Sequence, residues 1–123
     1  MVGVLIVDDS ALFRRAARDV IAATPGFVAV GEAASGEEAL QAVEDLDPGL
    51  VLIDVIMDGI GGIEAARRIT SACPHPTVVL ISVTEPTRLP SKVKGCGAVA
   101  LVDKRDFRPN LLADLWASHS PSD

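Results

Sequence analysis

The sequence is short of aromatic residues: tyrosine is absent, and aromatic side chains make up 3% of the 123 residues. A flat cofactor such as a flavin packs well between aromatic walls, so this shortage disfavours that class of site. Cysteine is scarce too, with only Cys73 and Cys96, far apart in the chain. They exclude a disulfide-rich secreted scaffold and lack the spacing of metal ligands. We expect both to be small buried thiols.

Positive charge and long apolar runs are also lacking. The chain has 11 Lys and Arg against 17 Asp and Glu, for a net charge of −6. Nucleic-acid phosphates and anionic lipids both require a basic face, so we expect this domain to bind neither nucleic acid nor a membrane. No apolar run is long enough to span a bilayer, and the start of the chain does not read as a signal peptide. These features predict a cytoplasmic location.

The remaining composition is that of a folded domain. Apolar residues form 49% of the chain and charged residues 23%, a balance typical of globular proteins. The length suits one domain. We expect this domain to cover residues 1–118 and residues 119–123 to form a polar tail.

Short apolar runs alternate with stretches in which apolar residues recur every three or four positions, the patterns of buried strands and amphipathic helices. The runs predict strands at residues 4–7, 27–30, 50–53, 77–81 and 99–102. Helical periodicity begins at Ala11, after Ser35, near Ile63 and at Leu111, and we expect a short or distorted helix that starts near Pro90. Because parallel strands need crossover helices, this order predicts an α/β three-layer sandwich built on a five-stranded parallel sheet.

Local signals mark several element boundaries. Asp9 or Ser10 can cap the first helix, and Ser35 with Glu38 matches a capping box at the start of the second. The glycine-bearing segment 58–62 predicts a flexible loop between the third strand and the third helix.

Polar side chains stand at the carboxyl ends of the strands, where an open α/β sheet forms its working crevice. They follow or end the first, third, fourth and fifth strands: Asp8, Asp9, Asp54, Ser82 and Lys104. Loops that merely face water would carry polar residues of any type. Carboxylates, a hydroxyl and a lysine at equivalent strand ends therefore indicate a site.

Three neighbouring carboxylates repel one another, and their pKa values rise unless a cation lies between them. Mg²⁺ suits such a set, because it prefers oxygen ligands and keeps several waters. Lys104 and Ser82 can stabilise the oxygens of a phosphoryl group in transfer. Asp54 stands alone at the end of the third strand, which makes it the expected nucleophile that forms an acyl phosphate.

At these residues the chain resembles the receiver domain of two-component response regulators. The segments that carry the resemblance lie in the family's order across essentially the whole chain: Val7-Asp8-Asp9-Ser10, Ile53-Asp54-Val55-Ile56-Met57 with Gly62, Ile81-Ser82-Val83, and Gly97-Ala98 before Lys104. The resemblance implies a flavodoxin-like (βα)5 fold with strand order 2-1-3-4-5. It also implies a signalling phosphoacceptor, not an enzyme, that catalyses only its own phosphorylation and dephosphorylation.

The resemblance also implies a metal site and a phosphodonor. Asp9 and Asp54 would bind Mg²⁺ directly, with the backbone carbonyl of Ile56 as a third ligand. Asp8 would hold the water shell of the metal. Asp54 would accept the phosphoryl group from a phosphohistidine of a sensor histidine kinase or a phosphotransfer protein.

A route for the signal is implied as well. Ser82 would be the hydroxyl switch residue, and Lys104 would pair with the phosphoryl oxygens. Ile56 and Thr84 hold positions that tune the lifetime of the phosphoryl group in the family. The output surface would comprise the fourth helix, the fifth strand and the fifth helix, through which a homodimer is possible.

Four features depart from the family pattern. Asp58 stands where proline is common and adds an acid near the site. Leu101 replaces an aromatic switch residue, and Arg105 replaces the proline whose peptide bond is usually cis. Pro86 and Pro90 predict a short or distorted fourth helix, because proline breaks a helix interior.

Three hypotheses remain at this point. The first is a phosphorylatable switch. The second, motivated by the altered output elements, is a pseudo-receiver that binds a protein partner without phosphotransfer. The third and weaker hypothesis is a flavodoxin-like cofactor binder, which the shortage of aromatic residues disfavours.

Overall fold

The computed structural model describes residues 1–73, 75–83 and 95–119. Its described strands are β1 (Val2–Val7), β2 (Phe27–Ala33), β3 (Leu50–Asp54), β4 (Thr77–Ser82) and β5 (Ala100–Asp103). Its described helices are α1 (Ala11–Ala22), α2 (Gly36–Leu46), α3 (Gly61–Ala72) and α4 (Pro109–His119), with a short 3₁₀ helix, η3 (Lys104–Asp106). The helix predicted near Pro90 lies outside the described residues.

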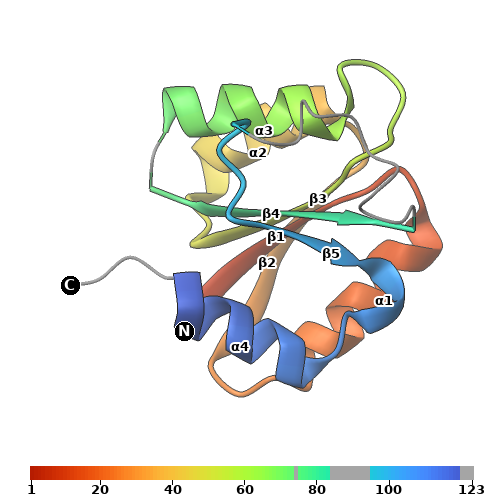
Figure 1. The fold of residues 1–123 in the computed structure, drawn as a ribbon, viewed down its shortest axis with the longest axis vertical. Helices are drawn as coiled ribbons and strands as arrows, with labels where there is room; N and C mark the ends of the chain where they lie inside the picture. The colour runs from red at the N-terminus through yellow and green to blue at the C-terminus, as the bar shows by residue number, and fades with distance from the viewer. Residues whose placement is uncertain (74, 84–94, 120–123) are drawn as a thin grey trace.

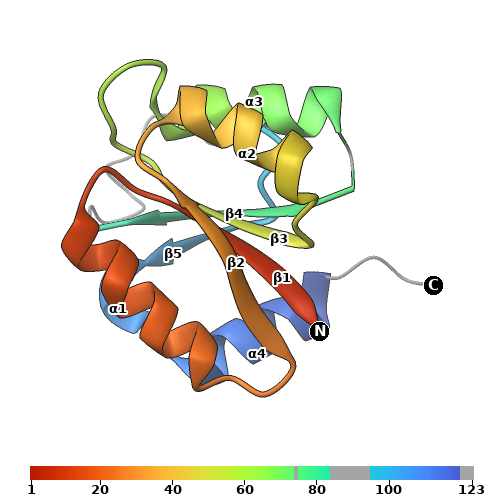
Figure 2. The same cartoon turned by 180° about the vertical axis from the view of Figure 1, so that it is seen from behind.

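The strands form one parallel sheet in the order β2-β1-β3-β4-β5, which confirms the predicted topology. Helices α2 and α3 cover one face of this sheet, and α1 and α4 cover the other (Figures 1 and 2). The central strand β3 is buried along its whole length. This explains its continuous apolar run, since a strand covered on both faces has no polar side to alternate with.

Each face of the sheet builds its own apolar core. One cluster joins the sheet to α2 and α3 through residues such as Leu5, Ile53 and Ile69. The other joins it to α1 and α4 through residues such as Ile6 and Leu112. The strands alternate between the two clusters because successive side chains point to opposite faces. The sheet is therefore a rigid platform, and the loops at its carboxyl edge are anchored on both sides.

Strand β2 is longer than predicted, ending at Ala33 instead of residue 30. It is an edge strand with three exposed side chains, so Gly31 and Glu32 do not extend an apolar pattern. Its pairing with β1 shifts between Val4 and Leu5, after which Glu32 and Ala33 still pair. Because β2 is an edge strand with a bulge in its pairing, the apolar pattern of the sequence does not reveal where it ends.

Serine caps both of the helices for which capping was predicted. Ser10 accepts a hydrogen bond from the Phe13 amide at 3.2 Å, and Ser35 accepts one from the Glu38 amide at 3.1 Å. The Glu38 carboxylate in turn accepts from the Ala34 amide at 3.4 Å. Of the two candidates for the first cap, Ser10 is the one used.

Two sequence predictions are wrong in part. Helix α3 begins at Gly61, so the last two residues of the predicted loop 58–62 are helical. Cys96 is buried as predicted, but Cys73 is only partly buried at the end of α3.

Within the described parts of the chain, no helix has the length and apolar character needed to cross a membrane.

Candidate functional site

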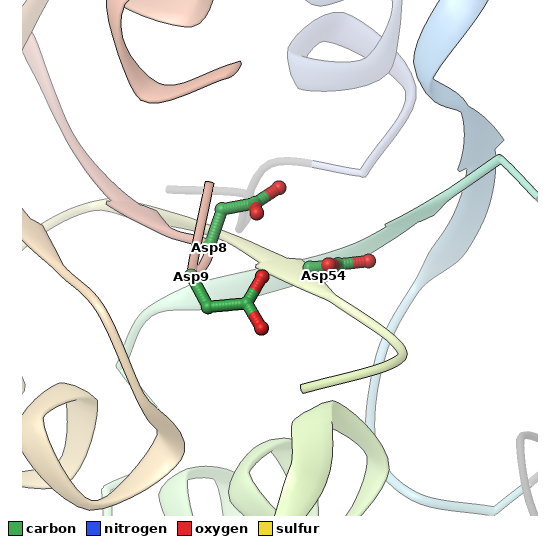
Figure 3. Close-up of side chains that lie close together, drawn as sticks. All are labelled: Asp8, Asp9 and Asp54. Atoms are coloured by element: carbon green, nitrogen blue, oxygen red, sulfur yellow. The ribbon is translucent and has the colours of Figure 1, made fainter. Parts of the chain in front are cut away.

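Three carboxylates meet at the carboxyl edge of the sheet (Figure 3). Asp8 and Asp9 follow β1, and Asp54 ends the neighbouring strand β3. One carboxylate oxygen from each residue lies within 4.8 Å of those of the other two. The structure thus brings together the three acids that the sequence singled out.

Asp8 is the deepest member of this acid cluster, with no exposed surface. Its Oδ1 accepts a hydrogen bond from the Ser10 amide at 2.8 Å, which ties the carboxylate to the start of α1. Its Oδ2 lies 2.5 Å from Lys104 Nζ and has no hydrogen-bond donor elsewhere in the described residues. Asp9 is exposed, so the cluster opens to solvent on its side.

Asp54 is 7% exposed. Its Oδ1 accepts a weak hydrogen bond from the Ile56 amide at 3.4 Å, and its Oδ2 lies 3.4 Å from Lys104 Nζ. Burial and the negative charge of Asp8 raise the pKa of Asp54 above its ordinary value, and the opposing effects of Lys104 and the Ile56 amide do not cancel this. Lys104 therefore offsets only part of the effect that burial and the charge of Asp8 have on Asp54.

Lys104 begins η3, directly after β5. The Asp103 carboxylate accepts a hydrogen bond from the Arg105 amide at 2.8 Å and so caps this turn. Hydrogen bonds from the side chain and amide of Arg105 lower the pKa of Asp103 to about 2. None of the described peptide bonds is cis, so the turn carries Lys104 into the site on a trans backbone.

The other predicted site residues that the structure describes lie at or shortly after the carboxyl ends of β3 and β4. Ser82 ends β4, is 2% exposed and pairs in register with Asp103 of β5. Ile56 presents its side chain to solvent, 63% exposed. The extra acid Asp58 is exposed and does not belong to the acid cluster. Thr84 lies outside the described residues.

Gly62 shapes the loop that carries Asp54. Its amide donates a hydrogen bond to the Val55 carbonyl at 3.1 Å. A Cβ at this position would lie 1.9 Å from the Asp54 carbonyl oxygen, far inside contact distance. Only glycine lets the first turn of α3 approach the acid so closely. Sequence reasoning included Gly62 in the resemblance but gave no physical reason for it.

Arg14 is a site residue that sequence reasoning missed. Its Nη1 donates a hydrogen bond to the Asp8 carbonyl at 2.7 Å, and its Nε donates to Glu32 Oε1 at 2.9 Å. Glu32 also binds Arg18 at 2.9 Å. Arg14 thereby fastens the backbone of the β1–α1 loop to β2. No local signal could reveal this contact, because Glu32 is 18 residues away in the chain.

The acid cluster fits a hard divalent cation. Its donors are carboxylate oxygens, the ligands that Mg²⁺ prefers. Two of the three acids are buried, and in the described residues a single lysine offsets them. Burial, and after it the negative charge of Asp8, raise the pKa of Asp54, and a cation would favour the ionised form against both effects. A bound cation and the Lys104 ammonium would also offset the negative charge of a phosphoryl group on Asp54, and Lys104 could pair with its oxygens.

The protein-family model of the response regulator receiver domain matches residues 4–115 of the chain. The chain belongs to this family. It is a receiver domain whose acid cluster of Asp8, Asp9 and Asp54 lies beside Lys104, the arrangement of a signalling phosphoacceptor.

Similar proteins agree with this assignment. Response regulator GacA of Pseudomonas viridiflava is 39% identical over 104 residues, 85% of this chain and 49% of that protein. Response regulator UvrY of Escherichia coli K12 is 36% identical over 104 residues, 85% of this chain and 48% of that protein. The chain spans about half the length of these curated relatives.

Solved receiver structures share the fold. The response regulator domain of Thermotoga maritima CheB superposes with a TM-score of 0.85 at 28% identity, covering 98% of this chain and 99% of that domain. A two-component response regulator of the LuxR family from Aurantimonas sp. SI85-9A1 superposes with a TM-score of 0.86 at 27% identity, covering 96% of this chain and 84% of that one. The receiver fold predicted by resemblance is confirmed.

Proposed function

We propose that this receiver accepts a phosphoryl group on Asp54 from a phosphohistidine of a sensor histidine kinase or a phosphotransfer protein. An Asp54 carboxylate oxygen attacks phosphorus, an O–P bond forms, and the N–P bond to the donor imidazole breaks. The bonding pair of the N–P bond returns to the imidazole nitrogen. The product is an acyl phosphate on Asp54.

Mg²⁺ at this site would be held by Asp9, Asp54 and the Ile56 carbonyl, with Asp8 orienting the metal's waters. When bound, the ion neutralises charge on the phosphoryl oxygens. Lys104 supplies the second positive charge, and the Ser82 hydroxyl donates a hydrogen bond to a further oxygen. These roles require groups that are already in place when charge develops, and Lys104 is already within 3.4 Å of Asp54.

The observation that carries this proposal is the position of Lys104 between two buried carboxylates. Its ammonium lies 2.5 Å from Asp8 Oδ2 and 3.4 Å from Asp54 Oδ2. Contact with both acids places one mobile positive charge where a phosphoryl group on Asp54 would need it.

Release of the signal is part of the same proposal. A phosphoryl group on Asp54 would draw the Ser82 hydroxyl inward and shift the loop that follows β4. It can favour this shifted state only if its contacts with Ser82 and Lys104 differ from those in the unphosphorylated state. Part of the output surface, the segment near Pro90, lies outside the described residues. The homodimer through that surface, the cytoplasmic location and the domain boundary at residue 118 stay predictions.

Labelling by acetyl phosphate tests the proposal without knowledge of the kinase. In the presence of Mg²⁺, intact-mass spectrometry should show addition of one phosphoryl group. The label should disappear with EDTA and in Asp54→Asn. The control Asp58→Asn changes an exposed acid four residues away and should label normally. A folded wild-type protein that no small donor labels would favour the pseudo-receiver instead.

A further inference from the structure

The ring of Phe13 faces the ammonium of Lys104. The distance from Nζ to the ring centroid is 4.5 Å, within the range of a cation–π interaction. Phe13 lies in the first turn of α1, and its amide donates to the capping hydroxyl of Ser10. The cap of α1, which follows Asp8 and Asp9, therefore also helps to position this ring.

A second aromatic ring fixes Phe13 from the lysine's own segment. Phe107 directly follows η3, and its amide donates to the Lys104 carbonyl at 3.3 Å. Its ring lies 6.4 Å from that of Phe13, tilted by 46°. Phe107 is 7% exposed and belongs to the core on the α1 side of the sheet. The backbone of Lys104 and the ring under its ammonium are thus joined through one core residue.

These contacts restrict a side chain that is otherwise flexible. A lysine has a long stem of rotatable bonds and a strongly hydrated ammonium. Here the side chain is 14% exposed, with carboxylates on one side and the Phe13 ring on another. The ring attracts the cation without adding a competing negative charge, and its face keeps water from that side of the ammonium.

We propose that Phe13 is a positioning residue for phosphoryl transfer, acting through Lys104. The ring holds the ammonium where it can pair with a phosphoryl oxygen on Asp54. Because an aromatic residue at position 13 contributes nothing to the acid cluster itself, this role is separate from metal binding. The inference rests on the proposed phosphorylation of Asp54.

Two substitutions at position 13 separate the ring from its bulk. Phe13→Leu keeps an apolar side chain but removes the π face, and Phe13→Tyr keeps the ring. We expect the rate of labelling by acetyl phosphate at saturating Mg²⁺ to fall about threefold to tenfold in Phe13→Leu, given the usual strength of a partly buried cation–π contact. Phe13→Tyr should label within about twofold of wild type. Equal rates for wild type and Phe13→Leu would overturn the proposal.

Phe27→Leu is the matched control. Phe27 belongs to the same core cluster and pairs with another aromatic residue, Trp116, at a centroid distance of 6.3 Å. It begins β2, at the end of the sheet opposite the acid cluster. Phe27→Leu should lower the free energy of unfolding and leave the labelling rate unchanged. A rate loss equal to that of Phe13→Leu would mean that core packing, not the contact with Lys104, sets the rate.

A double-mutant cycle tests whether Phe13 acts through the lysine. In a Lys104→Ala background, Phe13→Leu should cause no further loss of rate, because the cation is gone. The same threefold to tenfold loss in that background would overturn the proposal, since it would show a role independent of Lys104.

Proton NMR gives a readout that needs no phosphorylation. The ε-methylene protons of Lys104, close to the ring face, should resonate upfield of an ordinary lysine and return to the ordinary position in Phe13→Leu. An ordinary shift in wild type would overturn the contact itself. If wild type carries the upfield shift but no donor labels it, the proposed function has failed while the ring–lysine contact holds, and the two failures are distinguished.

Discussion

Asp54 shows how burial prepares a single residue for chemistry. Its carboxylate lies in the buried part of the acid cluster, and this burial, together with the charge of Asp8, raises its pKa. The ionised form, which is the nucleophile, therefore weakens the folded state when no cation is present. The ionised Asp54 carboxylate is therefore kept in place at some cost to the free energy of unfolding.

This cost predicts a pH-dependent effect of Asp54→Asn. The folded pKa lies above the ordinary 3.8, so the contribution of Asp54 to stability is present in full at low pH and is lost as the pH rises through the folded pKa. Without divalent metal at pH 7, Asp54→Asn should therefore have the higher free energy of unfolding in urea. The advantage should vanish below the ordinary pKa. Asp58→Asn, which changes an exposed acid outside the acid cluster, is the control at pH 7.

Gly62 gives a second prediction for a single residue. Gly62→Ala would force a methyl group against the Asp54 carbonyl, and we expect a loss of about 3 kcal/mol in the free energy of unfolding. The labelling rate should also fall, because relief of the clash moves Asp54. In the control Gly49→Ala, the nearest contact of the new Cβ is a Val2 methyl at 3.3 Å, and the labelling rate should not change. A Gly62→Ala protein of wild-type stability would contradict the close approach.

At the scale of elements, each loop of the site depends on the start of the helix or turn that follows it. The Ser10 amide holds Asp8, and the Ser10 hydroxyl caps α1. Asp103 caps η3, which carries Lys104. Arg14 ties the β1–α1 loop to β2. Helix caps and the hydrogen bonds of Arg14 therefore position the acid cluster more than contacts among its own carboxylates, which repel one another.

The two serine caps offer a matched pair of variants. Ser10→Ala and Ser35→Ala each remove one capping hydrogen bond, and each should lower the free energy of unfolding by about 1 kcal/mol. Only Ser10→Ala should slow labelling by acetyl phosphate, because α1 carries Phe13 and follows the acids of β1. Equal labelling rates in the two variants would show that the α1 cap does not position the site.

At the scale of the whole molecule, the sheet gathers acids that the chain separates by more than 40 residues. The two apolar cores hold the strand ends in place despite the repulsion between these acids. A ligand that binds this arrangement in the folded state alone must stabilise the fold.

Divalent metal should accordingly raise the stability of the receiver. Above its dissociation constant, Mg²⁺ should add about 1.4 kcal/mol to the free energy of unfolding for each tenfold rise in concentration. Thermal melts in a Mg²⁺ series measure this, with KCl added to keep the ionic strength constant. Asp9→Asn should abolish the effect, and Asp58→Asn should retain it. A stabilisation that persists in Asp9→Asn would place the cation elsewhere.

The acid cluster was visible in the sequence because its members end a strand or directly follow one. Buried parallel strands produce continuous apolar runs, so polar residues at their ends, such as Asp54 and Ser82, stand out from the pattern. Capping patterns placed the start of α2 at Ser35 and left Asp9 and Ser10 as the two candidates for the cap of α1. The apolar pattern could not extend β2 to Ala33, since an exposed edge strand with a bulge loses that contrast.

The amino-acid sequence by itself determined the parallel α/β architecture and the acids of the site, because periodicity and strand ends are local properties of the chain. Its motifs indicated the family by resemblance. Only the tertiary structure decided which distant groups hold those acids and their lysine: Arg14 with Glu32, Gly62 against Asp54, and Phe13 beneath Lys104. These contacts join residues whose proximity depends on the register of the sheet and the packing of its helices. No local pattern along the chain predicts that these residues come into contact.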